Sequence, residues 1–162
     1  MKKFILLFLL FAILSCQEKP ASEKKESNTE DLNLPPPPRA IDENNLIGFA
    51  CYMAGERSEV VKNFSTLLKQ KKYRILREKL TSTFPAEKYM ATILCEKLLY
   101  KHLLKITEQE LIQIQNNKLS SDTLTICSGC TNEDDLTLKE MFSPSKNYLS
   151  AQLNEWFEQV IE

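Results

Sequence analysis

Cysteine is the residue type with the clearest chemical potential in this chain. The sequence contains five cysteines, and Cys127 and Cys130 are separated only by a serine and a glycine. Two thiols at this spacing can close a small disulfide ring, and dithiol enzymes use the same spacing with the first thiol at a helix N-terminus. Cys127 and Cys130 are therefore a candidate disulfide or redox site.

The residues around this pair favour a structural bridge over a redox centre. The sequence after Cys130 is polar and acidic and predicts no helix beginning there, and Glu133, Asp134 and Asp135 would raise a thiol pKa rather than lower it. A redox-active dithiol, metal ligation and free thiols remain the alternatives. A zinc site with four cysteines normally has a second closely spaced pair, which this sequence lacks, so we expect no metal.

Cys51 and Cys95 stand alone among apolar residues of predicted helices. We expect them to be buried as small hydrophobic residues, with a second disulfide between them as the alternative. With Cys16 set apart, four cysteines allow three complete pairings, and the sequence leaves the choice open.

Other chemistry has little support in the sequence. His102 is the single histidine, which excludes paired-histidine zinc sites, and it lies near the end of a predicted helix, where a cation stabilises the helix dipole. The three glycines are too far apart to form a phosphate-binding loop. With 21 basic and 22 acidic residues, the chain has no overall field to attract nucleic acid. We expect no cofactor and no nucleic-acid partner, and an enzyme is the less favoured class.

The first residues have the pattern of an export signal. Lys2 and Lys3 precede an uninterrupted apolar run from Phe4 to Leu14. This run is too short to span a bilayer as a helix, which requires about twenty apolar residues, but it suits the hydrophobic region of a signal peptide. We therefore expect residues 1–15 to be removed after export.

The end of this run, Ile13-Leu14-Ser15-Cys16, resembles the lipobox of bacterial lipoproteins. The resemblance implies that Cys16 receives a diacylglyceryl group and becomes the first residue of the mature chain. Because several acyl chains on one residue give durable attachment, it also implies a membrane anchor at Cys16. Gln17 stands where some lipoproteins carry an aspartate that retains them in the inner membrane, so the resemblance favours the outer membrane.

Residues 16–40 read as a disordered tether. They are rich in Lys, Glu, Ser, Asn and Pro and lack the apolar residues needed to form a core. Four consecutive prolines, residues 35–38, predict a short polyproline II spacer, or alternatively a ligand for a partner's groove.

Residues 41–162 predict a helical domain. A first helix is expected to carry Leu46, Phe49 and Met53 and to end at Gly55. Ser58 is a candidate N-cap for a second helix, and Thr107 with Glu110 forms a capping-box pattern for a later one. Further apolar stripes predict helices over residues 73–80, 85–104, 136–142 and 143–161, and residues 119–127 favour one short strand near Cys127.

The helices expected at residues 73–80 and 85–104 resemble a single HEAT-type helical hairpin, although no second copy occurs at a fixed period. The expected fold is mainly α, a small bundle of about five to seven helices with a short β element. The expected function is a non-enzymatic binding or structural lipoprotein of the cell envelope with a protein partner. The alternatives are a thiol oxidoreductase using Cys127 and Cys130, and an inhibitor or immunity-type lipoprotein.

Overall fold

The computed structural model of the chain describes residues 40–129, 132–144 and 149–162. Arg39–Glu162 form one compact unit. The buried hydrophobic residues that the structure describes all belong to this unit, which therefore has a core of its own. The predicted signal peptide, Cys16 and the tether before Ala40 lie outside the described residues.

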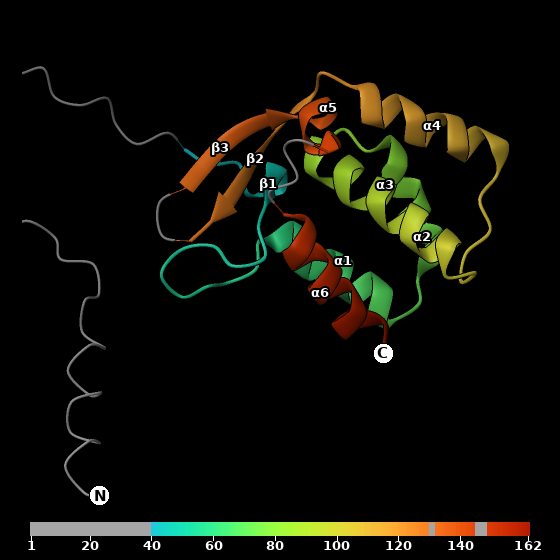
Figure 1. Cartoon of the computed structure of the whole chain (residues 1–162), viewed down its shortest axis with the longest axis horizontal. Helices are drawn as coiled ribbons and strands as arrows, with labels where there is room; N and C mark the ends of the chain where they lie inside the picture. Colours follow the sequence, from blue (N-terminus) through green and yellow to red (C-terminus); the bar gives the residue numbers. More distant parts are fainter. Residues whose placement is uncertain (1–39, 130–131, 145–148) are drawn as a thin grey trace, which may run out of the picture. The chain divides into compact units, whose positions relative to one another are not determined.

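The folded unit is mainly helical, with a small sheet at one side (Figure 1). Its described residues form six α-helices, which confirms the predicted fold class. The helices are α1 (Glu59–Lys69), α2 (Tyr73–Glu78), α3 (Pro85–Tyr100), α4 (Glu108–Leu119), α5 (Leu138–Met141) and α6 (Ser150–Ile161). Two short 3-10 helices, η1 (Glu43–Asn45) and η2 (Lys79–Thr81), precede β1 and α3, respectively.

The sheet has three strands in the order β1 (Leu46–Ile47), β2 (Thr123–Ser128) and β3 (Asn132–Thr137). β1 runs parallel to β2, and β2 pairs antiparallel with β3. The strand predicted near Cys127 is thus confirmed as β2, and it has neighbours on both sides. Successive side chains of a strand point to opposite faces, so Leu124 and Ile126 enter the main core while Cys127 faces the other side.

The prediction of a helix that ends at Gly55 is wrong. Leu46 and Ile47 are extended because they pair with Thr125 and Ile126 of β2, and a loop follows them. The spacing of Leu46, Phe49 and Met53 mimics a helical stripe, but Leu46 and Phe49 belong to different apolar clusters and Met53 is exposed. Gly55 does adopt a positive φ of 64°, in a turn rather than at a helix end.

The helix boundaries follow local signals that the sequence carries. Thr107 and Glu110 form the predicted capping box at the start of α4, with the Glu110 amide donating to Thr107 Oγ1 at 3.2 Å. Two helices end without glycine: Lys71 and His102 adopt positive φ values of 51° and 58° directly after the C-caps of α1 and α3. His102 is exposed and lies just beyond α3, so it completes the end of that helix.

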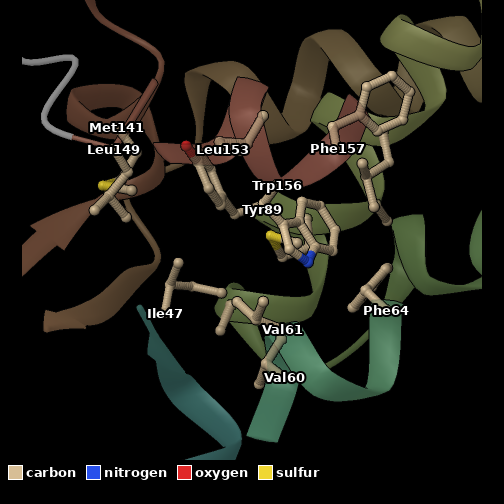
Figure 2. Packing of buried hydrophobic residues seen from close by; sticks show 14 of the residues in the cluster. Ile47, Val60, Val61, Phe64, Tyr89, Met141, Leu149, Leu153, Trp156 and Phe157 are labelled. Carbon is tan, nitrogen blue, oxygen red and sulfur yellow. The ribbon is translucent and has the colours of Figure 1, made fainter. Parts of the chain in front are cut away.

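The main core lies between α1, α3, α6 and the inner face of the sheet. Figure 2 shows Trp156 and Phe157 of α6 near Val61 and Phe64 of α1, with Ile47 of β1 in the same cluster. The Trp156 ring also packs against Phe49, with 5.4 Å between ring centroids. The final helix therefore docks against the core, as its apolar stripe predicts.

A buried polar contact joins three further segments. Asn117 of α4 is almost fully buried, and its amide donates to the carbonyl of Leu80 at 2.9 Å and to Thr92 Oγ1 at 3.0 Å. Gln113 Nε2 donates in turn to the side-chain oxygen Oδ1 of Asn117 at 2.8 Å. Because each of these groups would be costly to bury alone, the contact fixes how α4 lies on α3.

Candidate functional site: the disulfide-linked loop

The structure joins Cys51 to Cys127 in a disulfide, with 5.3 Å between the two Cα atoms. This corrects the expected local bridge between Cys127 and Cys130 and the alternative bridge between Cys51 and Cys95. The physical reason is the sheet, because the chain continues past β1 alongside β2 and Cys51 forms a parallel bridge with Gly129. Cys130 lies outside the described residues.

Both cysteines of the bridge are buried. Cys51 is 1% exposed and Cys127 is 2% exposed, and together with Leu46 they form a small apolar cluster apart from the main core. Ile41 packs against this cluster. An attacking thiolate must reach a sulfur atom to exchange a disulfide, so this environment suits a structural bond.

Cys95 lies apart from this bridge, in the middle of α3. It is a free thiol and fully buried, as the sequence analysis expected for a small hydrophobic residue. Burial raises the pKa of the Cys95 thiol to about 12, and the carboxylate of Glu110 adds to the shift. The thiol therefore stays protonated at neutral pH and is a poor nucleophile.

Gly48 is required by the disulfide. A Cβ atom at this position would overlap the Sγ atoms of both Cys51 and Cys127 and would lie 2.7 Å from the Cys127 carbonyl oxygen. The close approach of backbone to sulfur is open only to glycine. Gly48 also forms two hydrogen bonds with Ser58: its amide donates to Ser58 Oγ at 3.2 Å, and the Ser58 amide donates to its carbonyl at 2.9 Å.

Ser58 is the N-cap residue of α1, as predicted, but its hydroxyl does not cap the helix. It accepts from Gly48 instead. These hydrogen bonds join the start of α1 to the end of β1. Residues 49–57 therefore form a loop whose two ends lie side by side.

Residues 51–56 form a loop at the edge of the sheet, which we call loop 51–56. Its two ends form an antiparallel bridge, in which the Cys51 amide donates to the Glu56 carbonyl at 2.7 Å and the Glu56 amide donates back at 2.9 Å. The Tyr52 amide donates to the Gly129 carbonyl at 2.9 Å, and the Gly129 amide donates to the Ala50 carbonyl, also at 2.9 Å. In Figure 1 the segment that carries this loop reaches out beside β2.

The tip of loop 51–56 is exposed although its base is fixed. Met53 is 76% exposed and Tyr52 is 40% exposed. Tyr52 has a φ of 60°, which non-glycine residues seldom adopt, and the turn is completed by the Gly55 amide donating to the Tyr52 carbonyl at 3.2 Å. A disulfide and several backbone hydrogen bonds thus hold a loop on which Met53 is largely exposed and Tyr52 is partly exposed.

Loop 51–56 presents the apolar side chain of Met53 at the surface, while the sulfur of Cys51 is buried and bonded. No cluster of His, Cys, Asp or Glu able to hold a metal ion occurs among residues 40–129, 132–144 and 149–162. Cys51 and Cys127 are bonded to each other, and Cys95 is buried and protonated. A fixed loop with an exposed methionine and tyrosine can instead contact a macromolecule, since both side chains present polarizable apolar surface.

Loop 51–56 was not predicted, because the spacing of Leu46, Phe49 and Met53 favours a helix that ends at Gly55. The usable signal is Gly48 together with Cys51, since glycine near a cysteine suits close packing of backbone against sulfur. Within the part of the chain that the structure describes, no helix has both the length and the apolar character required to cross a bilayer.

Comparison with known proteins does not place the chain in a family. It matches no family model, no curated protein sequence and no solved structure.

Proposed function

We propose that the chain is a lipid-anchored protein of the bacterial cell envelope whose folded domain binds another protein through loop 51–56. The binding role is supported by the fact that this loop has a fixed base and an exposed tip. Its base is held by the Cys51–Cys127 disulfide, while Met53 at its tip is 76% exposed. A loop fixed in one conformation loses little entropy when it binds, and this favours affinity.

The anchor is supported by the leader sequence. Lys2 and Lys3, the apolar run and the lipobox-like Ile13-Leu14-Ser15-Cys16 occur in the order expected of a lipoprotein precursor. Gln17 after the cysteine favours delivery to the outer membrane. The disulfide is compatible with this location, because structural disulfides persist in oxidising compartments outside the cytoplasm.

An inhibitor or immunity-type protein is the narrower form of this proposal. A rigid, exposed loop is a suitable shape for entering a cleft on a target, and the side chain of Met53 can adapt to an irregular apolar surface. The tether of residues 16–40 would allow the domain to reach a target at some distance from the membrane.

The oxidoreductase alternative is less favoured. It requires an accessible thiol at Cys127, but that sulfur is bonded to Cys51 and the residue is 2% exposed. Cys127 also lies within strand β2, whereas the reactive thiol of a dithiol enzyme lies at a helix N-terminus.

The binding role can be tested by site-specific photo-crosslinking in intact cells. A photoreactive phenylalanine analogue replaces Met53 in one strain and Leu119 in another. Leu119 is the matched control because it is also apolar and is 70% exposed, but it lies on α4. The proposal expects a discrete protein adduct from position 53 and none from position 119. Equal crosslinking from both positions, or none from either, would contradict it.

The anchor is tested separately by intact mass. Mature protein isolated from membranes should begin at Cys16 and carry the added mass of acyl chains. Cys16→Ala should abolish that mass and release the protein from the membrane fraction. A mature chain that begins elsewhere and lacks acyl mass would refute the anchor, while leaving the role of loop 51–56 to the crosslinking result.

A further inference from the structure

A groove of about 470 Å³ runs along the surface between α3 and α6. This volume falls within the roughly 300–1,000 Å³ typical of small-molecule sites. Its lining is mostly apolar, with Ile93 and Tyr100 on the α3 side and Leu153 and Phe157 on the α6 side. Tyr100 stands at the rim and is 86% exposed.

Lys97 of α3 and Lys101, the residue directly after this helix, both lie over one aromatic ring in this groove. The Nζ atoms of Lys97 and Lys101 lie 5.2 Å and 6.0 Å from the centre of the Phe157 ring. Their methylene stems cover the ring, which is fully buried, and so add apolar surface to the groove.

The two ammonium groups are neutralised unequally. Lys101 pairs with Glu158 at 2.8 Å, whereas Lys97 donates to the uncharged amide oxygen of Asn154 at 2.6 Å. Glu96, the other carboxylate of the groove, lies 2.7 Å from Lys118. Among the described residues, no carboxylate lies within ion-pair distance of Lys97, so Lys97 is the lysine of the groove that lacks an ion pair.

The surroundings of Lys97 disfavour its charged form. Partial burial lowers the pKa of Lys97 below the usual value for lysine; Glu158 opposes the shift and Lys101 adds to it. A ligand anion beside Lys97 would stabilise the ammonium form and reverse this shift.

We infer that the groove binds an amphiphile with one carboxylate and an alkyl body, such as a medium-chain fatty acid. The carboxylate pairs with Lys97 and the alkyl chain lies along Ile93, Tyr100 and the lysine stems. A single carboxylate on the ligand would give Lys97 the ion-pair partner that it lacks. The volume of the groove lies in the range of small-molecule sites, which favours a small ligand. None of the residues of loop 51–56 is involved, so this site is independent of the proposed protein-binding role.

Calorimetry with decanoate below its micellar concentration tests the inference. The protein used begins at Gln17, because the folded unit Arg39–Glu162 contains its own core. We expect saturable binding of one decanoate per chain. Lys97→Gln should weaken it about tenfold, as expected for loss of a hydrogen bond between charged groups, while Lys97→Arg should retain it. Lys71→Gln is the charge-matched control, an exposed lysine beyond α1 that should leave binding unchanged.

Ligands of other chemistry complete the test. Decylammonium, which has the same chain length and the opposite charge, should bind at least tenfold more weakly, and acetate should not bind measurably. Equal affinity for decanoate and decylammonium would overturn the inference, as would unchanged affinity in Lys97→Gln. Binding of a short acidic peptide without binding of decanoate would also overturn it and would assign the groove to a protein ligand.

Discussion

The indole of Trp156 donates a hydrogen bond from Nε1 to Ser65 Oγ at 3.0 Å, and Ser65 Oγ donates to the Val61 carbonyl at 2.8 Å. Both residues are buried, and they link α6 to α1 across the main core. The only polar atom of the Trp156 side chain is thereby satisfied inside an apolar environment.

Ser65→Ala should lower the free energy of unfolding by about 1–3 kcal/mol, because it leaves the buried indole N–H without an acceptor. Urea denaturation followed by far-UV circular dichroism measures this change. Thr66→Ala is the control: Thr66 is the next residue of α1, is exposed, and donates to the Lys62 carbonyl at 3.2 Å. It should change stability by no more than about 0.5 kcal/mol. Equal losses in the two variants would contradict the proposed contact.

Replacing Cys51 and Cys127 together by alanine should lower the free energy of unfolding by about 2–4 kcal/mol. The bridge spans a sequence separation of 76 residues, and its loss frees that loop in the unfolded chain. A reducing agent should lower the free energy of unfolding of the wild-type protein by a similar amount and leave that of the double variant unchanged. Cys130→Ser should still respond to the reductant like the wild type. A loss of that response in Cys130→Ser would argue for a different pairing.

Gly48→Ala should be destabilising by about 1–3 kcal/mol, since the added methyl group would overlap both sulfur atoms. The penalty should become smaller when Cys51 and Cys127 are already alanine. Part of it should remain, because the methyl group would still lie 2.7 Å from the carbonyl oxygen of residue 127. Denaturation of the four proteins of this cycle measures the coupling, and an equal penalty in both backgrounds would mean that the sulfur atoms are not the obstacle.

The hydrogen bond from Lys88 Nζ to Asp122 Oδ2, at 2.6 Å, holds the pKa of Asp122 below its ordinary value. Lys88→Gln should therefore raise the pKa of Asp122 toward that ordinary value, which an NMR titration of its carboxyl carbon would record. Because the folded-state pKa is lowered, this interaction stabilises the fold above the unfolded-state pKa. The contribution is lost as the pH falls through the folded-state pKa.

Lys62→Gln provides the control for this titration. Lys62 pairs with Glu59 at 2.8 Å rather than with Asp122, so its replacement should leave the Asp122 titration unchanged. If Lys88→Gln and Lys62→Gln shift Asp122 alike, the effect is one of net charge and not of the Lys88 contact.

The helices could be predicted largely from the sequence because their signals are local. Each signal involves only residues that are close together in the chain. Examples are the apolar stripe of α1, Pro85 at the first position of α3 and the Thr107–Glu110 capping box. The capping box at Thr137 and Glu140 is of the same kind, and it marks the start of α5 within the segment where a short helix was expected.

The sheet and the disulfide depend on distant partners and could not be predicted in the same way. Leu46 and Ile47 form a strand only because they pair in parallel with β2, which lies far along the chain. Cys127 and Cys130 are close in sequence, and this closeness suggested a local ring. Proximity to Cys51 arises only after β1 and β2 have paired, so no spacing rule could reveal it.

The central claim, that the Cys51–Cys127 disulfide fixes loop 51–56, is tested most directly by peptide mapping of the unreduced protein. Free thiols are alkylated under native and denaturing conditions, the protein is digested, and the linked peptides are identified by mass spectrometry. We predict a linked peptide pair containing Cys51 and Cys127, and alkylation of Cys95 only after unfolding. A peptide in which Cys127 is bonded to Cys130, with Cys51 alkylated, would contradict the account.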